Sequence, residues 1–131
     1  DAQYLLAIEA FSGARFEKND EKGFYWLSKA AEVNKFARVK YAWLLATHAD
    51  AKYRNGKLAQ ELLLTVDDSH VDKLSFYQAQ AAAAAETGHF DDAVKWQKKA
   101  FEDAKELELP LTHVEQQLAS YTNKTAWREA I

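Results

Sequence analysis

Hydrophobic side chains recur every three or four positions along almost the whole chain, with polar residues between them. The first segment shows this pattern in Tyr4, Leu5, Ile8 and Phe11, and it is followed by Gly13, a residue type that commonly ends helices. No stretch alternates steadily between apolar and polar residues, as a half-buried strand would. The expected helices cover approximately residues 4–11, 21–33, 36–48, 56–66, 70–87, 90–107 and 111–121. The pattern therefore predicts an all-α protein of six or seven helices.

The polar breaks between these segments contain residues that typically begin or end helices. Asn19 and Asp20 precede the second segment, and their side chains can accept hydrogen bonds from free N–H groups at a helix start. Asp68 or Ser69 is expected to cap the fifth helix in the same way. Pro110 ends the sixth helix, because proline lacks the N–H group that continues a helix.

Composition narrows the possible fold and partners. With 131 residues, the chain is long enough for one domain with a buried core. It has only 4 Gly and 1 Pro, and because sheet proteins need many turns built from these residues, their scarcity favours helices joined by short loops. The formal net charge of -3 gives no overall attraction to nucleic acids, and no apolar run approaches the roughly 20 residues that cross a bilayer. We therefore expect neither nucleic-acid binding nor membrane insertion.

Two residue types are absent. The lack of cysteine excludes disulfides, thiolate zinc sites and a cysteine nucleophile. Methionine is missing too, including at position 1, so we expect the chain to begin either at a cut or after removal of a leader. Neither absence indicates a compartment, and periplasmic and cytoplasmic locations both stay open.

Three of the expected helices share an internal pattern. Each places a small residue three positions before a bulky one, in the pairs Gly23–Trp26, Ala59–Leu62 and Ala93–Trp96. The small residues are spaced by about 35 positions, which is the period of helix-turn-helix repeats. A small side chain lets two helices approach closely, and a bulky one fills the space against the next pair. We therefore expect Trp26, Leu62 and Trp96 to be mostly buried.

These residues carry a family resemblance. The segment from residue 2 to 34 resembles a Sel-like repeat, with matches at Ala2, Tyr4, Leu6, Phe11, Gly13, Asp20, Lys22, Trp26, Leu27, Lys29, Ala30 and Ala31. The segment from residue 77 to 104 resembles a tetratricopeptide repeat, with Tyr77, Ala81, Gly88, Ala93 and Ala100 at the signature positions. From residue 41 to the C-terminal tail, the order and spacing are similar to a common bacterial tetratricopeptide module. In the tail, Ala126 and Trp127 stand where that module usually has Pro and Tyr.

The resemblance implies a short right-handed α-solenoid of antiparallel helix pairs in a single domain, residues 1–131. Its repeats would cover about 2–34, 36–66 and 70–107, followed by a capping helix and tail at 111–131. We expect the end of the array to be covered by Leu111, Val114, Leu118, Tyr121 and Trp127. The implied function is a scaffold that holds a protein or peptide on its concave face. The alternative is a helical accessory or regulatory domain of a larger enzyme, and a homo-oligomer is a further open possibility.

The resemblance also implies which residues would touch a partner. In tetratricopeptide arrays, the first helix of each pair lines the concave face. Carrying the inward positions over selects Leu5, Glu9, Tyr41, Leu44, His48, Lys52, Gln78, Ala82 and Glu86. This set mixes apolar, aromatic and charged side chains, which suits an extended peptide or a partner helix. An alternative for Tyr41 and Leu44 is that both belong to the core.

Residues that could support catalysis have simpler explanations. The acidic clusters around histidines comprise His70 with Asp67, Asp68 and Asp72, and His89 with Asp91 and Asp92. Both clusters stand at expected helix starts, so we expect capping and not metal binding. No serine lies in a nucleophile turn, and no glycine-rich loop is present to hold a phosphate. We therefore expect no enzymatic activity, no metal and no cofactor.

Two further features have a packing explanation and a functional one. Residues 81–85 are five consecutive alanines, which we expect to let neighbouring helices pack closely; the alternative is that they floor a shallow groove. Trp26, Trp43 and Trp96 recur at repeat positions, so we expect them to pack against the core in preference to stacking on a ligand.

Overall fold

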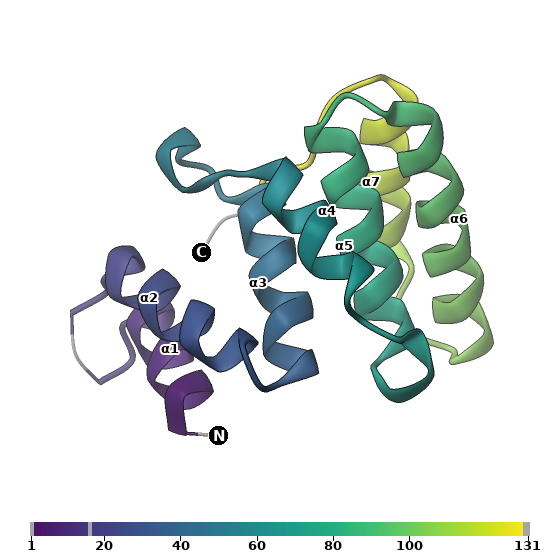
Figure 1. The fold of residues 1–131 in the computed structure, drawn as a ribbon. Helices are drawn as coiled ribbons and strands as arrows, with labels where there is room; N and C mark the ends of the chain where they lie inside the picture. The colour runs from purple at the N-terminus through teal and green to yellow at the C-terminus, as the bar shows by residue number, and fades with distance from the viewer. Residues whose placement is uncertain (1, 16, 130–131) are drawn as a thin grey trace.

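The computed structural model describes residues 2–15 and 17–129, without the side chain of residue 70, and within them it contains helices and no strands (Figure 1). Two single-turn 3₁₀ segments, η1 (Ala51–Tyr53) and η2 (Asp68–His70), lie in the connections. The α-helices are α1 (Ala2–Ser12), α2 (Asp20–Ala31), α3 (Lys35–Thr47), α4 (Gly56–Leu64), α5 (Lys73–Glu86), α6 (Phe90–Glu106) and α7 (Thr112–Thr122). The prediction of an all-α protein with six or seven helices is confirmed for the described part of the chain.

Side chains cap the starts of α2, α3, α4 and α5, whereas His89 before α6, where capping was expected, and Leu111 before α7 make no side-chain cap hydrogen bond. The side chain of Asn19 accepts a hydrogen bond from the backbone N–H of Lys22 at 3.0 Å, so Asn19 caps α2 as expected. The predicted start of the fifth helix at residue 70, capped by Asp68 or Ser69, is wrong. Asp72 caps α5 instead, and its Oδ2 accepts from the backbone N–H of Ser75 at 3.3 Å.

The start of α5 differs from the prediction because several neighbouring residues can each cap a helix start. Asp67 accepts a hydrogen bond from the backbone N–H of Ser69 at 3.0 Å and thereby begins the short turn η2. The turn η2 extends to residue 70. α5 therefore begins after it, and Asp72, the third acidic residue of the cluster, caps α5. The expectation that acids of this cluster cap helix starts is confirmed for Asp67 and Asp72.

Consecutive helices pack side by side, and α3 and α5 occupy the middle of the array (Figure 1). α3 contacts α2, α4 and α5, whereas α1 packs chiefly against α2, and α7 packs against α6. The small residues of the internal pattern are buried at these contacts. A Cβ atom on Gly23 would lie 2.7 Å from the ring of Phe11, so the close approach of α1 and α2 requires glycine here.

The bulky residues of the pattern are less buried than their small partners. Trp26, Leu62 and Trp96 are partly buried and pack against the edges of the core clusters, while Ala59 and Ala93 are completely buried. The rings of Trp96 and Phe76 meet edge to face, with 6.1 Å between their centroids. The tryptophans thus pack against the core as expected, but each keeps some contact with solvent.

All five alanines from residue 81 to 85 are buried in α5. Ala82 and Ala83 belong to the cluster shared with α3 and α4, whereas Ala81, Ala84 and Ala85 pack with α6 and Tyr121. Because α5 has neighbours on several sides, small side chains all around it allow every neighbour to approach closely. The packing explanation of this run is confirmed.

The C-terminal helix and tail cover the last hydrophobic surface. Val114 is buried and packs with Leu111 against two alanines of α6. Tyr121 is also buried and contacts Trp127 in a separate cluster against α5 and α6. Leu118 is only partly buried and lies outside these clusters. Four of the five residues expected at the end of the array therefore pack against the core clusters of α5 and α6.

Candidate functional site

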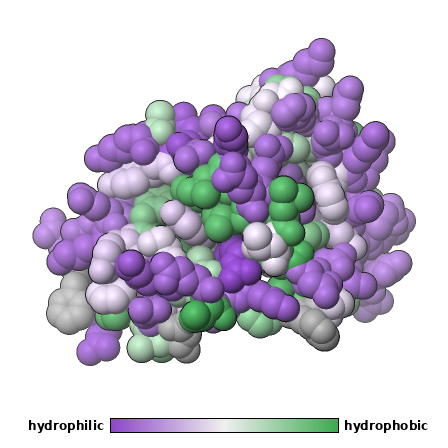
Figure 2. Space-filling model, viewed as in Figure 1, coloured by the Kyte–Doolittle hydropathy of each residue, from purple (hydrophilic) through white to green (hydrophobic). Residues whose placement is uncertain are grey.

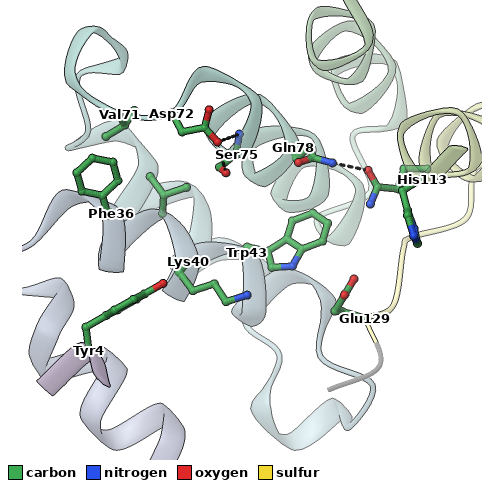
Figure 3. Close-up of a pocket in the computed structure, with 12 residues that line it drawn as sticks. Tyr4, Phe36, Lys40, Trp43, Val71, Asp72, Ser75, Gln78, His113 and Glu129 are labelled. Atoms are coloured by element: carbon green, nitrogen blue, oxygen red, sulfur yellow. Dashed lines mark hydrogen bonds between the residues drawn. The ribbon is translucent and has the colours of Figure 1, made fainter. Parts of the chain in front are cut away.

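A groove of about 440 Å³ lies where α1, α3, α5, α7 and the C-terminal tail converge (Figure 3). Each odd-numbered helix contributes at least one side chain, and the even-numbered helices contribute none. The residues that line it are Tyr4, Phe36, Val39, Lys40, Trp43, Val71, Asp72, Ser75, Gln78, His113, Gln117 and Glu129. We refer to this feature below as the odd-helix groove.

One stripe of α3 supplies Phe36 and Trp43, two of the aromatic side chains that line the odd-helix groove, and Tyr4 of α1 adds a third. Phe36, Lys40 and Trp43 follow one another at helical spacing, so they share a face of α3. Phe36 is 60% exposed, which is unusual for so large an apolar side chain. Lys40 is partly buried and makes no hydrogen bond or ion pair with any described residue. This face therefore offers an apolar surface next to a positive charge that has no ion-pair partner among the described residues.

A polar wall from α5 and α7 faces this stripe. Gln117 Oε1 accepts hydrogen bonds from Gln78 Nε2 at 3.0 Å and from Gln97 Nε2 at 2.9 Å. Gln97 reaches this position from α6, is 0% exposed, and also donates to the carbonyl of Val114 at 3.1 Å. Nothing in the sequence pattern indicated this network, because its three glutamines lie on three different helices.

The C-terminal tail closes one end of the odd-helix groove. The backbone N–H of Glu129 donates to the carbonyl of Thr47 at 2.8 Å, which joins the tail to the end of α3. Arg128 forms an ion pair with Glu86 at 2.8 Å, and Trp127 Nε1 donates to Glu129 Oε2 at 3.3 Å. The tail thus runs from α7 to α3 and contributes the carboxylate of Glu129 to the groove wall.

Of the residues selected from the family resemblance, only Gln78 lines the odd-helix groove. Leu44 is 1% exposed and Ala82 is 2% exposed, so both are core residues and cannot touch a partner. Tyr41 opens instead onto a separate cleft between α2, α3 and α4, next to Leu62 and Arg38. Burial raises the pKa of Tyr41.

The misplacement of Tyr41 and Leu44 has a simple physical cause. α3 has large apolar residues on several sides, and it packs against both α2 and α5. Tyr41 and Leu44 face the cluster around Leu27 of α2, and Trp43 packs at the edge of that cluster while it also lines the groove together with Phe36. In the view of Figure 2, hydrophobic side chains gather near the middle of the molecular surface, and hydrophilic side chains surround them.

His48 makes contacts within the protein that connect α2 with the segment after α3. Its Nε2 lies 3.0 Å from Oδ2 of Asp20, and its Nδ1 accepts a hydrogen bond from the backbone N–H of Asp50 at 2.9 Å. Because Nδ1 accepts, the neutral ring carries its proton on Nε2 and donates it to Asp20. The ring also packs against Phe24 and Tyr53, at centroid distances of 5.5 and 4.9 Å. His48 therefore joins α2 to the end of α3 and does not face the groove.

The remaining selected residues also lie away from the odd-helix groove. Lys52 is exposed, with its ammonium group 5.0 Å from the ring centre of Tyr53. Glu86 is held between Arg128 and Arg54, the latter at 3.4 Å. Glu9 lines a different cleft on the other side of α1, and Leu5 is exposed.

Within the described residues, no three His, Cys, Asp or Glu side chains lie close enough together to hold a metal ion. None of the helices in that part of the chain has both the length and the apolar character needed to cross a membrane. The chain matched no protein-family model, no curated protein and no solved structure.

Proposed function

We propose that this protein is an interaction module that holds a peptide or a segment of a partner protein in the odd-helix groove. The observation that carries this proposal is the convergence of four helices from distant parts of the sequence on one groove. That groove combines the aromatic surfaces of Phe36 and Trp43 with Lys40, Gln78 and Glu129. A surface with apolar area, both signs of charge and amide groups suits a polypeptide better than a uniformly charged ligand.

The proposal includes the finer architecture. We propose that α1–α2, α3–α4 and α5–α6 are antiparallel repeats of a short right-handed solenoid of tetratricopeptide or Sel-like type, with α7 as the cap. The buried small residue in the second helix of each pair supports this arrangement. So does the composition of the groove, because among the described helices only the first helix of each pair and α7 contribute to it.

The proposal can be tested by site-specific crosslinking. Phe36 is replaced by a photoreactive phenylalanine, and the chain is irradiated in a lysate to capture proteins bound at the odd-helix groove. Tyr25 on α2 provides a matched control position, because it is also an aromatic residue and is 55% exposed. Partners captured at position 36 but not at position 25 are then identified and purified.

The affinity of each identified partner is then compared for Phe36→Ala and Tyr25→Ala. Truncating an aromatic contact residue in a binding site typically weakens binding about tenfold or more, so Phe36→Ala should do so while Tyr25→Ala changes it less than about twofold. Equal effects of the two substitutions, or an effect of Tyr25→Ala alone, would refute the groove as the binding site.

A further inference from the structure

A continuous chain of hydrogen bonds runs from the protein interior to the odd-helix groove. It begins at the backbone carbonyl of Val114, passes through Gln97 Nε2 to Gln117 Oε1, and ends at Gln78 Nε2. The donor–acceptor distances along it are 3.1, 2.9 and 3.0 Å. Figure 3 shows its last link as the dashed line that leaves Gln78.

This chain determines which end of each side-chain amide faces which neighbour. A backbone carbonyl can only accept, so Gln97 must direct its NH₂ group toward Val114. The same NH₂ group faces Gln117, which must therefore present its oxygen. That oxygen in turn requires the NH₂ group of Gln78. Reversing any one amide would place two donors or two acceptors against each other in a buried site.

The fixed amide orientations determine which polar atoms the groove surface presents. With these orientations, Gln78 Oε1 and Gln117 Nε2 are left without a hydrogen-bond partner among the described residues, and neither atom is fully buried. Gln117 as a whole is only 4% exposed, so its side chain is held firmly and has little freedom to turn toward bulk water. The groove thus presents one acceptor and one donor from two adjacent amides.

We infer that this pair of amides recognises the main chain of an extended peptide segment, an inference that rests on the proposed function. In an extended chain, the N–H and C=O groups of one residue point to the same side, as they do in a β-ladder. The N–H can donate to Gln78 Oε1, and the C=O can accept from Gln117 Nε2. A helical partner could not provide these groups, because its main-chain N–H and C=O groups are bonded within the helix. Gln97 acts as a positioning residue, since it orients Gln117 without reaching the groove.

The test uses a peptide probe without charge. A library of linear, acetylated and amidated heptapeptides built from Ala, Leu, Val, Phe, Ser and Asn is selected on the wild-type chain, and a second library carries the same residues in lactam-stapled helices. Peptides whose binding is abolished by Phe36→Asp are kept as groove ligands. Each kept peptide is then remade with a single backbone ester, which removes one N–H donor and weakens the neighbouring carbonyl as an acceptor.

Gln117→Glu is the sharpest variant. The carboxylate can still accept from Gln78 and Gln97, but it replaces the NH₂ group at the groove with an acceptor. Gln116→Glu is its matched control, because Gln116 is exposed on the same helix and the change in charge is identical. We expect Gln117→Glu to weaken binding of the linear peptides about fivefold to tenfold, the usual effect of one lost hydrogen bond, and Gln116→Glu to change it less than about twofold.

The ester series tests the same inference on the wild-type chain, so it does not depend on whether Gln117→Glu folds. We expect the ester that removes the donating N–H to weaken binding by a similar factor, the ester at the next position to weaken binding less because it only weakens the accepting C=O, and esters elsewhere to have little effect. Ligands that come only from the helical library, or equal binding to Gln117→Glu and Gln116→Glu with no sensitive ester position, would overturn the inference while leaving the proposed function in place. If neither library yields a peptide that depends on Phe36, both proposals fail.

Discussion

Asp20 and His48 connect the start of α2 to the end of α3 across 3.0 Å. The carboxylate of Asp20 also forms an ion pair with Lys18, and the His48 ring packs against Phe24 and Tyr53, whose rings stack on each other. The first helix pair contacts the rest of the array mainly through α2 and α3. The Asp20–His48 pair therefore helps to set how α1 stands relative to the odd-helix groove, to which α1 contributes Tyr4.

Replacing Asp20 should make the free energy of unfolding vary less with pH in the acid range. Partial burial raises the pKa of Asp20, but the hydrogen bonds from Lys18 and His48 and the charge of Lys18 lower this pKa by more than burial raises it, so the net value lies below the ordinary 3.8. A lowered folded-state pKa means that the carboxylate stabilises the fold above about pH 4, and that this contribution is lost as pH falls through the folded-state value. Asp20→Asn should lower the free energy of unfolding by about 1–2 kcal/mol at pH 7.

The measurement is urea unfolding of both chains between pH 2.5 and 7, with Asp68→Asn as a control at an exposed acid. The difference between wild type and Asp20→Asn should shrink as pH falls toward the acid end of this range. A difference that stays constant from pH 7 to pH 2.5 would exclude the carboxylate as its source.

Gly23→Ala should destabilise the chain although alanine is the better helix former. The added Cβ would lie 2.7 Å from the Phe11 ring, which is itself buried and has little room to move. Overpacking of this kind costs about 1–3 kcal/mol, more than the roughly 1 kcal/mol that alanine contributes through helix propensity. Chemical denaturation measures the change. Combining Gly23→Ala with Phe11→Leu should recover part of the loss, and a Gly23→Ala chain more stable than wild type would contradict the close contact of α1 and α2.

Truncating Trp96 should open a gap between α5 and α6. Its ring meets Phe76 edge to face at 6.1 Å, lies 6.0 Å from the ring of Tyr77, and has the ammonium group of Lys99 4.8 Å from its centre. Because the ring is only partly buried, we expect Trp96→Ala to cost about 2–4 kcal/mol, toward the lower end of the range for large aromatic residues. Thermal unfolding with Lys95→Ala as an exposed control on the same helix checks this. A loss below about 1 kcal/mol would show that the repeat positions do not support the core.

Removing residues 110–131 should leave a chain that aggregates or loses its fixed packing. α7 and the tail cover Ala93, Ala100 and Ala104 of α6. Without this cover, the apolar face of α6 would meet water, and the terminal unit of a helical array needs a polar outer surface to remain soluble. Size-exclusion chromatography and near-ultraviolet circular dichroism are the measurements. A monomeric truncated chain that melts cooperatively would disprove the capping role of α7.

The sequence by itself determined the helices and their closest contacts. Hydrophobic periodicity and caps such as Asn19 are local properties of the chain, so they located seven helices to within a few residues. The small residues Gly23, Ala59 and Ala93 marked the tight contacts for the same reason, because a helix crossing of that kind leaves no room for a larger side chain. Where several caps compete, as at Asp67, Asp68 and Asp72, the local signal was ambiguous and the predicted helix start was wrong.

Only the tertiary structure decided which side of each helix faces the groove. α3 has large apolar side chains around most of its circumference, so periodicity alone cannot distinguish Leu44, which is buried against α2, from Phe36 and Trp43, which are only partly covered and line the groove. The same holds for the amide chain of Gln97 and Gln117, whose members lie on separate helices. Such contacts depend on the rotation and packing of whole helices, and these follow from the sum of many distant interactions that no short stretch of sequence contains.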